Sequence, residues 1–379
     1  MNWLITTVVL LFLVIVFRRR LRFIWRLFVI VGSTVPGPIK SLFNRVSRAV
    51  SMELSSYLDG DGNDQPLRIY HPATAGECAA FILYPGASPA GEEHEAVNEL
   101  ALALARGGFR VFLPRIPELK KVLIRQESIN HIIRVYEAVS GRQDVDATRI
   151  AAVGMSFGGS LMVKACCDKR MIVKPAVVLS YGSFFDFEKT LEFVLTGNFS
   201  DGINDYHLEP HEWGRVGFFH NFIQYVDGDF DFNNVQSYLL TCAGAEEDKV
   251  LAAYSDLSRK DQRFVDKILK DSDLETQKLA QETLAKVRAT IEPLSPRSFL
   301  DRIDFPLFLM HGANDTMVPF TETVMFDRAL RERGKQVDTF ISYLYAHSEV
   351  TEHSKGYIGF IREAWKIGVF MSRLLGKLV

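Results

Sequence analysis

The sequence predicts an α/β protein: a mostly parallel sheet with helices on both faces and an inserted helical cap. Three observations predict this fold class. Short apolar runs of strand length alternate with segments of helical spacing, which is typical of sheets whose strands are joined by crossover helices. Glycine or proline closes several of the apolar runs, as at Pro85-Gly86. The alternation stops between residues 184 and 296, which predicts an insertion there.

The expected elements follow one another in alternating order on both sides of the insertion. Before it they are strand 79–84, helix 95–106, strand 110–113, helix 128–139, strand 149–153, helix 161–167 and strand 175–179. After it they are strand 306–310, helix 322–333, strand 336–343 and helix 356–378. The predicted core is therefore residues 67–183 and 297–379, with a helical linker over residues 35–66.

The predicted cap, residues 184–296, has two parts of different composition. Its first part is rich in phenylalanine, and its second is a charged tract with oppositely charged pairs four residues apart, such as Asp266 with Lys270, which support exposed helices. The phenylalanines have two interpretations. They bury one another as the core of the cap, or they line a pocket for an apolar acyl chain.

Composition excludes several classes of function. The chain has 379 residues, 47% apolar residues and a net charge of −2, so no basic surface for nucleic acid is expected. The four cysteines, Cys78, Cys166, Cys167 and Cys242, have neither zinc-site spacing nor the density of a disulfide framework. They are interpreted as free thiols. The sequence predicts no metal site and no cofactor.

The N-terminus contains an uncharged run from Trp3 to Phe17 that stops at Arg18-Arg19-Arg20. As a helix the run would span roughly 23 Å, somewhat less than a hydrocarbon core of about 30 Å. A cleaved signal peptide would carry its positive charge before the run, whereas here the charge follows. Residues 1–34 are therefore predicted to be a single-pass membrane anchor with a basic flank. The positive-inside rule then places the large domain in the cytoplasm.

The segment Gly154-Met155-Ser156-Phe157-Gly158 lies between a predicted strand and a predicted helix. A sharp turn at that junction needs small residues on either side of the serine, and Gly154 and Gly158 provide them. The serine hydroxyl is then held above the sheet edge and faces a cleft. This pattern in this position predicts that Ser156 is a nucleophile.

A nucleophilic serine needs a histidine base, and that histidine needs a carboxylate partner. Asp315 directly follows the strand ending at Met310, and His347 directly follows the last strand. Alternatives remain open for both roles. Asp301 or Asp304 can replace Asp315, and His353 is the rival of His347. We interpret His311 as a structural residue that supports the loop of Asp315.

From about Ala79 onward the chain resembles the α/β-hydrolase superfamily, in which the triad follows the order serine, acid, histidine. The resemblance implies the α/β-hydrolase fold, with Ser156 as nucleophile, Asp315 as acid and His347 as base. It also implies an oxyanion hole made by the backbone N–H groups of Phe157 and Ala87. Many members have His-Gly-X where this chain has Pro85-Gly86-Ala87, but the donor there is a main-chain group.

The expected function is a serine hydrolase that cleaves an ester or thioester of an apolar acyl group through an acyl-enzyme. The expected partners are a small acyl ester and a membrane, without nucleic acid. Three alternatives stay open: a non-catalytic binding or scaffold protein of the same fold, a peptidase, and an acyltransferase.

Overall fold

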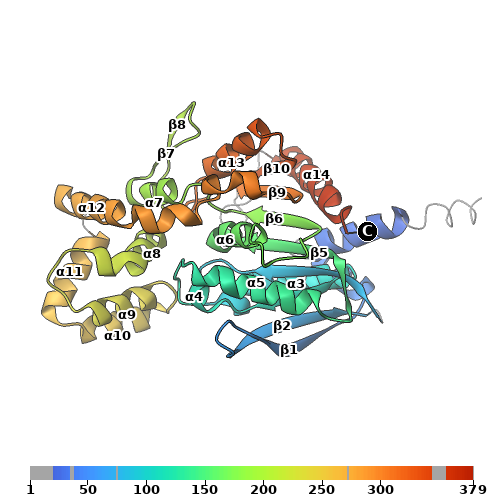
Figure 1. Cartoon of the computed structure of the whole chain (residues 1–379), viewed down its shortest axis with the longest axis horizontal. Helices are drawn as coiled ribbons and strands as arrows, with labels where there is room; N and C mark the ends of the chain where they lie inside the picture. Colours follow the sequence, from blue (N-terminus) through green and yellow to red (C-terminus); the bar gives the residue numbers. More distant parts are fainter. Residues whose placement is uncertain (1–19, 35–37, 74–75, 271–272, 344–355, 379) are drawn as a thin grey trace, which may run out of the picture.

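The computed structural model describes residues 20–34, 38–73, 76–270, 273–343 and 356–378. Figure 1 shows a central sheet with helices on both of its faces and a helical cap beyond one end of the strands. The sheet has eight strands in the order β1-β2-β4-β3-β5-β6-β9-β10. Their bounds are β1 (Val50–Leu58), β2 (Asp64–Pro72), β3 (Cys78–Tyr84), β4 (Arg110–Pro114), β5 (Val145–Met155), β6 (Val177–Tyr181), β9 (Leu307–Gly312) and β10 (Val337–Ser342).

The sheet is parallel from β4 to β10, whereas β2 runs antiparallel to β4 and β1 runs antiparallel to β2. Each parallel strand is followed by helical structure, because parallel neighbours need a crossover connection. These helices are α3 (Glu95–Arg106), α4 (Pro117–Lys120), α5 (Glu127–Ser140), α6 (Ser156–Cys166), α13 (Thr321–Glu332) and α14 (Gly356–Leu375). The predicted fold class, a mostly parallel sheet covered on both faces, is confirmed.

Two apolar clusters lie on opposite faces of the sheet because successive strand residues point to opposite sides. Ile82 of β3 belongs to the cluster that includes side chains of α5, α6 and α13. Its neighbour Phe81 belongs to the other cluster, with side chains of α3 and α14. The alternation within β3 therefore assigns each helix to a face.

The cap is the chain between β6 and β9. It contains α7 (Phe187–Thr196), the hairpin β7 (Asn198–Ser200) and β8 (Asp205–His207), α8 (Glu212–Phe222), α9 (Phe232–Cys242), α10 (Glu247–Asp256), α11 (Arg259–Lys270) and α12 (Leu274–Ile291). Its phenylalanines are core residues: Phe184, Phe187, Phe193, Phe218, Phe219 and Phe222 are each exposed by less than about 2%. Several pack ring to ring, as do Phe184 and Phe187 at 4.6 Å between centroids. Aromatic burial within the cap therefore accounts for them.

The structure differs from the expected linker at residues 35–66. Helix α2 (Pro38–Val46) is followed by β1, which pairs with β2 along its whole length. In β1 most side chains are exposed, so the strand lacks the apolar alternation that marks a half-buried strand in sequence. The sheet consequently begins at Val50 rather than near Leu67.

The predicted membrane anchor is also corrected. Within the part of the chain that the structure describes, no helix is both long and apolar enough to cross a bilayer, so the single-pass topology and the localisation inferred from it are dropped. The run from Trp3 to Phe17 lies outside the described residues. The predicted basic flank forms a helix over residues 20–34 whose Val29 and Ile30 are buried against the domain.

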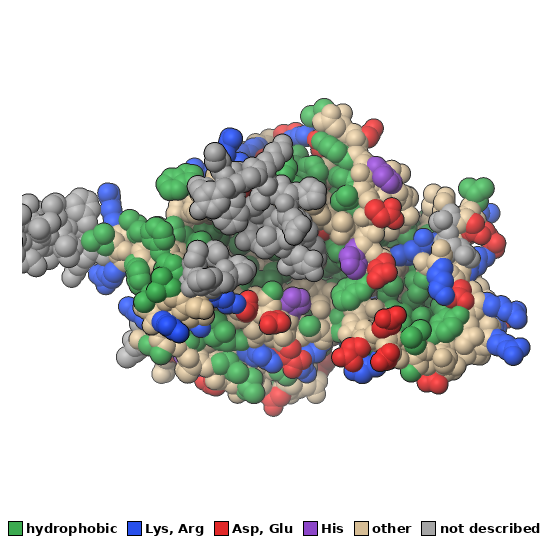
Figure 2. All heavy atoms as spheres, turned by 180° about the vertical axis from the view of Figure 1, so that it is seen from behind, with side chains coloured by type: hydrophobic (Ala, Val, Ile, Leu, Met, Phe, Trp, Pro, Cys, Tyr) green, Lys and Arg blue, Asp and Glu red, His purple; other side chains and the backbone are tan. Residues whose placement is uncertain are grey.

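That helix has two faces. On the inner face, the Arg26 guanidinium lies over the Phe109 ring, 5.4 Å from its centroid. On the outer face, apolar side chains of this helix and of α2 are exposed, and Figure 2 shows apolar side chains gathered at this end of the molecule. They are Leu21, Ile24, Trp25, Phe28, Leu42 and Val46. Arg20, Arg22 and Arg26 therefore belong to a helix that packs on the domain.

Candidate active site

Ser156 lies at the junction of β5 and α6 without any intervening loop. Met155 still has extended backbone angles, whereas Ser156 has a φ of 50°, in the left-handed region that residues with a Cβ rarely adopt. The chain thus reverses from strand to helix at a single residue. This is the sharp turn that the sequence predicts at Ser156, and it raises the side chain at the carboxyl edge of the parallel strands.

The glycines around Ser156 are required by close backbone contacts. A Cβ atom on Gly154 would lie 2.6 Å from the Cα of Gly159, and one on Gly158 would lie 2.1 Å from the carbonyl oxygen of Pro85. Neither contact is possible for a larger residue without moving the backbone. Gly154 therefore lets β5 approach the first turn of α6, and Gly158 lets α6 approach the loop after β3.

The loop after β3 lies directly against the serine. A Cβ on Gly86 would be 2.9 Å from the Cβ of Ser156 and 3.6 Å from its Oγ. The following residue is Ala87, and the amide of Ser88 donates to the carbonyl of Leu119 at 3.0 Å, which fixes the loop on α4. The sequence-predicted oxyanion loop is thus beside the sequence-predicted nucleophile.

The backbone amide of Phe157 is one of the first amides of α6, which have no acceptor within the helix. Among the described residues, the amide of Ala87 likewise donates no hydrogen bond. Two main-chain donors near Ser156 are therefore available for an oxyanion. Their assignment as an oxyanion hole remains a prediction.

Asp315 lies in the turn after β9, and its side chain is 1% exposed. Its Oδ1 accepts hydrogen bonds from the amides of Met317 and Val318, at 2.8 and 2.9 Å. These backbone donors fix the orientation of the carboxylate. The rivals Asp301 and Asp304 are at the exposed surface before β9, away from the carboxyl edge where Asp315 lies.

His311 is fully buried beneath this turn. Its Nδ1 lies 2.7 Å from the Thr323 hydroxyl, and its Nε2 lies 2.9 Å from the Val318 carbonyl oxygen and 3.4 Å from Asp315 Oδ2. The ring therefore ties the turn to helix α13. These contacts fit the supporting role that the sequence predicts for His311.

His347 and its rival His353 lie in residues 344–355, outside the described part of the chain. The structure does show that β10, the strand before them, is the parallel neighbour of β9. Ser156 therefore follows β5, Asp315 follows β9, and His347 comes after β10 in sequence, all three strands being parallel. The structure brings two of the three predicted side chains to one edge of the sheet and leaves the third untested.

The sequence did not predict a second unusual backbone conformation near the elbow, the sharp turn of residues 154–158 around Ser156. Val122, just after α4, has a φ of 58°, which is unusual for a β-branched residue. The buried side chain of Asn221 in cap helix α8 holds it: Nδ2 donates to the Val122 carbonyl and Oδ1 accepts from the Ile124 amide, each at 2.8 Å. No pattern in the sequence links residues about 100 positions apart in this way.

The cysteines and the acidic side chains give no sign of other chemistry in the described residues. Burial raises the pKa of the Cys166 thiol, and burial also raises that of Cys167 to about 12, so neither is a reactive thiolate. No group of three or more His, Cys, Asp or Glu side chains within the described residues is arranged to hold a metal ion.

The comparisons with known proteins agree with this fold. The sequence profile of the prolyl oligopeptidase family matches residues 261–360, which include Asp315 and His347 but not Ser156. A search of curated proteins finds no match. Among solved structures, the acylaminoacyl peptidase of Pyrococcus horikoshii is similar with a TM-score of 0.51 and 16% identity, over 90% of this chain and 44% of that one.

Two further structures are similar to the same extent. A puromycin-hydrolyzing peptidase of Mycobacterium tuberculosis has a TM-score of 0.51 and 15% identity, over 87% of this chain and 40% of that one. DcsB, solved with a substrate analogue, has a TM-score of 0.50 and 14% identity, over 87% of this chain and 100% of its own. The chain thus spans less than half the length of the two peptidases. The sheet order, the elbow and these likenesses establish the α/β-hydrolase fold.

Proposed function

We propose that the protein is a serine hydrolase that cleaves an acyl bond with Ser156 as nucleophile, Asp315 as acid and His347 as base. The observation that carries this proposal is the left-handed Ser156 between β5 and α6. A strained residue persists only where its surroundings over-determine it, and such residues cluster at functional sites. Buried Asp315, in the turn after β9, would supply the carboxylate that a base needs, and β9 is the second parallel strand along the sheet from β5.

In the proposed reaction, Ser156 Oγ attacks the substrate carbonyl while His347 takes its proton. Asp315 orients the imidazole and stabilises its charge. The amides of Phe157 and Ala87 bind the oxyanion, and one such donor typically contributes about 3 kcal/mol. His347 then protonates the leaving group, and water releases the acyl group from Ser156 by the same steps.

An amide bond is the favoured substrate within this class. The matched profile is that of the prolyl oligopeptidase family, and it covers the segment that holds both Asp315 and His347. Two similar structures are described as peptidases. The expected preference for apolar acyl esters loses its main support, because the cap phenylalanines are buried against one another. We therefore propose a peptidase, with ester cleavage as a side reaction of the same nucleophile.

Covalent labelling tests the nucleophile. A fluorophosphonate should label the protein, and Ser156→Ala should remove the label without lowering the unfolding temperature, since the small side chain is only partly buried. The matched control is Ser160→Ala in the same helix, whose hydroxyl donates to the Phe184 carbonyl at 2.6 Å. That variant should lose stability but keep the label. A label that persists in Ser156→Ala would place the chemistry elsewhere.

Substrate comparison tests the bond that is cleaved. An N-acetylated peptidyl p-nitroanilide should be hydrolysed, and Ser156→Ala should lower kcat/KM by about 10³-fold or more. Hydrolysis of p-nitrophenyl acetate should depend on Ser156 as well. If only the ester is cleaved, the serine hydrolase stands and the peptidase is rejected.

A further inference from the structure

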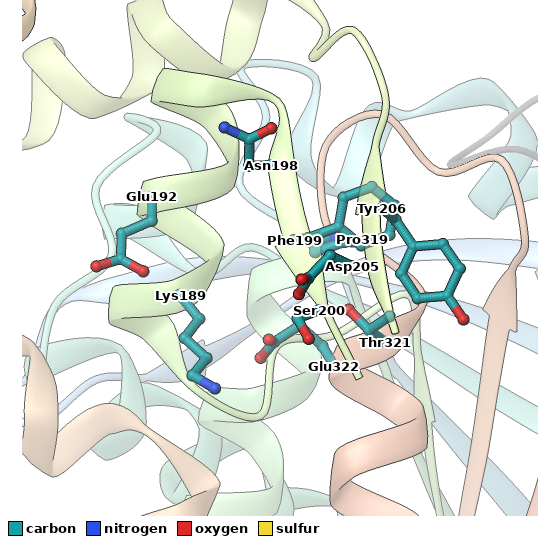
Figure 3. A pocket seen from close by; sticks show the side chains of 10 residues that line it. All are labelled: Lys189, Glu192, Asn198, Phe199, Ser200, Asp205, Tyr206, Pro319, Thr321 and Glu322. Atoms are coloured by element: carbon teal, nitrogen blue, oxygen red, sulfur yellow. The ribbon is translucent and has the colours of Figure 1, made fainter. Parts of the chain in front are cut away.

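The free edge of the sheet at β1 differs from the pocket between the cap and the core in how its polar groups are paired. The pocket has a volume of about 450 Å³, and Figure 3 shows it between helix α7, the hairpin β7–β8 and the start of α13. Several polar side chains of its wall already bond within the chain: Asn198 with His207, Ser200 with Asn204, Tyr206 with Asp201, and Glu322 with Phe185 and Asp186. At β1 it is the backbone groups that lack partners.

Strand β1 is the end strand of the sheet, and among the described strands it pairs only with β2. In Figure 1 it lies at the lower margin of the sheet, and no described helix or strand lies beyond it. The pairing with β2 continues from Val50 to Leu58 without a bulge. Nine residues of strand present about 30 Å of continuous edge. A row of N–H and C=O groups along such an edge can pair with a strand of another chain.

The turn after β1 shows which residues face the open edge. The Asp59 amide donates to the Asn63 carbonyl at 3.0 Å, so these two residues form a hydrogen-bonded pair. Such pairs alternate along an antiparallel ladder, so the odd-numbered residues of β1 bond to β2 and the even-numbered ones direct their N–H and C=O groups outward. Pro66 opposite Ser56 agrees with this register, because proline has no N–H to donate. Among the described residues, no hydrogen bond outside the ladder reaches these outward groups.

The even-numbered residues of β1 also carry exposed apolar side chains on one face of the strand. Met52, Leu54 and Leu58 are exposed by 48, 73 and 61%. Glu53 is the one charged residue of the strand, and its carboxylate lies 2.8 Å from the His71 ring of β2. Open edges in natural sheets are usually protected by lysine, proline, a bulge or a short strand, and β1 has none of these.

The opposite edge of the sheet is protected by charge. Strand β10 has six residues, and its Asp338 pairs with Arg373 of α14 at 2.9 Å. The Arg331 guanidinium donates to the Val337 carbonyl at 3.3 Å. Charged side chains thus lie along β10 and disfavour the approach of another strand. An apolar edge at β1 beside a charged edge at β10 is expected if β1 has a partner.

A second copy of β1 fits this edge. When two copies run antiparallel about Leu54, all nine residues overlap, and the even-numbered residues exchange their outward N–H and C=O groups. On the apolar face the opposed residues are Leu54 with Leu54, Met52 with Ser56, and Val50 with Leu58. On the other face Glu53 lies opposite Ser55, so no like charges meet.

We propose that the protein forms a two-fold symmetric dimer in which two β1 strands pair antiparallel about Leu54 and join two eight-stranded sheets into one. Such a contact uses the same surface on both subunits, so it closes and does not grow into a filament. Strand β1 lies four places along the sheet from β5, and the dimer does not depend on Ser156 or on the proposed hydrolase activity.

Sedimentation velocity of the purified full-length protein over a concentration series tests the dimer. We expect a monomer–dimer equilibrium in the micromolar range, because one strand edge is small for an interface. Leu54→Lys should weaken the dimer by roughly tenfold or more, since it places two ammonium groups opposite each other. The unfolding temperature should not change, because Leu54 is exposed.

Leu251→Lys is the matched control for this substitution. It makes the same change at a leucine of α10 that is 57% exposed, and it should leave the dimer intact. Ser156→Ala should dimerise as the natural protein does, which separates the dimer from the hydrolase. A protein that stays monomeric throughout, or a dimer that Leu54→Lys does not weaken, would overturn the proposal.

Cysteine cross-linking tests the register of the two strands. In a hydrogen-bonded antiparallel pair the Cα atoms are about 5.5 Å apart, a separation that a disulfide spans. Leu54→Cys should therefore give a disulfide-linked dimer on mild oxidation. Leu58→Cys should not, because the two copies of residue 58 are about 27 Å apart in this register. The natural protein, with its four cysteines, should give none either. Cross-linking in Leu58→Cys, or its absence in Leu54→Cys, would reject this pairing.

Discussion

Among the described residues, two that are not glycine have a left-handed backbone, Ser156 with a φ of 50° and Val122 with a φ of 58°. They are held in different ways. Ser156 is fixed by backbone packing inside the core, where Gly158 and Pro85 are in direct contact. Val122 is held by local backbone bonds, in which its amide donates to the Leu119 carbonyl, and by the hydrogen bonds that its own carbonyl and the Ile124 amide make with Asn221 of the cap. The turn at Ser156 is therefore a property of the core, whereas the turn after α4 also has partners in the cap.

The turn at Val122 lies next to the segment that supports the loop of Ala87. The Leu119 carbonyl, three residues before Val122, accepts from the Ser88 amide beside the proposed oxyanion donor Ala87. His220 and Asn221 of the cap both bond to backbone groups of residues 121–124. The cap thus contacts the segment that supports the loop of Ala87, while Ser156 is held independently of the cap.

The largest effect is expected from Gly158→Ala. The new Cβ would lie 2.1 Å from the Pro85 carbonyl oxygen, so the loop of Pro85, which includes the proposed oxyanion donor Ala87, must move away from α6. We expect a loss of about 2–4 kcal/mol in the free energy of unfolding and loss of fluorophosphonate labelling. The control is Gly217→Ala in α8, where a Cβ meets nothing within 4 Å and should be neutral or slightly stabilising. Labelling that survives in Gly158→Ala would mean that the elbow tolerates movement of this loop.

The second-largest loss of stability is expected from Asn221→Ala. It leaves the Val122 carbonyl and the Ile124 amide buried without partners, which should lower the free energy of unfolding by about 2–3 kcal/mol. Trypsin should then cut the native protein faster after Lys121 and Arg125, as mass spectrometry of the fragments would show. Asn130→Ala, which removes only an exposed contact with Arg170, is the control. Unchanged proteolysis in Asn221→Ala would show that the core alone holds the turn.

A smaller, pH-dependent effect is expected at Glu322 of α13, which makes another polar contact with the cap. Burial, together with the nearby Asp186 carboxylate, raises the pKa of Glu322 from 4.5 to about 8. Protonated Glu322 therefore favours the folded state. Its contribution is fully present below about pH 4.5 and is lost as the pH rises through about 8.

In Glu322→Gln the amide oxygen can still accept from Phe185 and Asp186, but nothing titrates. The free energy of unfolding of the variant, relative to the natural protein, should rise by about 1–2 kcal/mol between about pH 6 and 7.5. Urea unfolding at several pH values measures this difference. A difference that is flat with pH would show that Glu322 is ionised throughout.

The sequence could predict the parallel strands of the sheet and the turn at Ser156 because both follow from local patterns. Strand β3 is a closed apolar run, and Gly154 and Gly158 flank a serine between a strand and a helix. The same applies to Asp315, which directly follows a buried strand. These features need only the identity of neighbouring residues.

Features that depend on distant contacts could not be predicted. Strand β1 is mostly exposed and is defined by its pairing with β2 rather than by apolar alternation. The arginine at position 26 suggested a membrane surface, but its partner in the fold is Phe109. The contacts of Asn221 and Glu322 join chain segments about 100 residues or more apart, and no periodicity records such a pairing.

The insertion of the cap between β6 and β9 has a consequence for how the protein folds. These strands are neighbours in the sheet, with Val178 opposite Leu307, so pairing them closes a loop of about 130 residues. For a flexible loop of that length, closure has an entropic cost of roughly 4 kcal/mol before any contact is gained. A cap that folds early brings its own ends together and removes much of that cost. Ser156 lies before this loop and Asp315 after it, so the two residues reach the same end of the sheet only once the loop has closed.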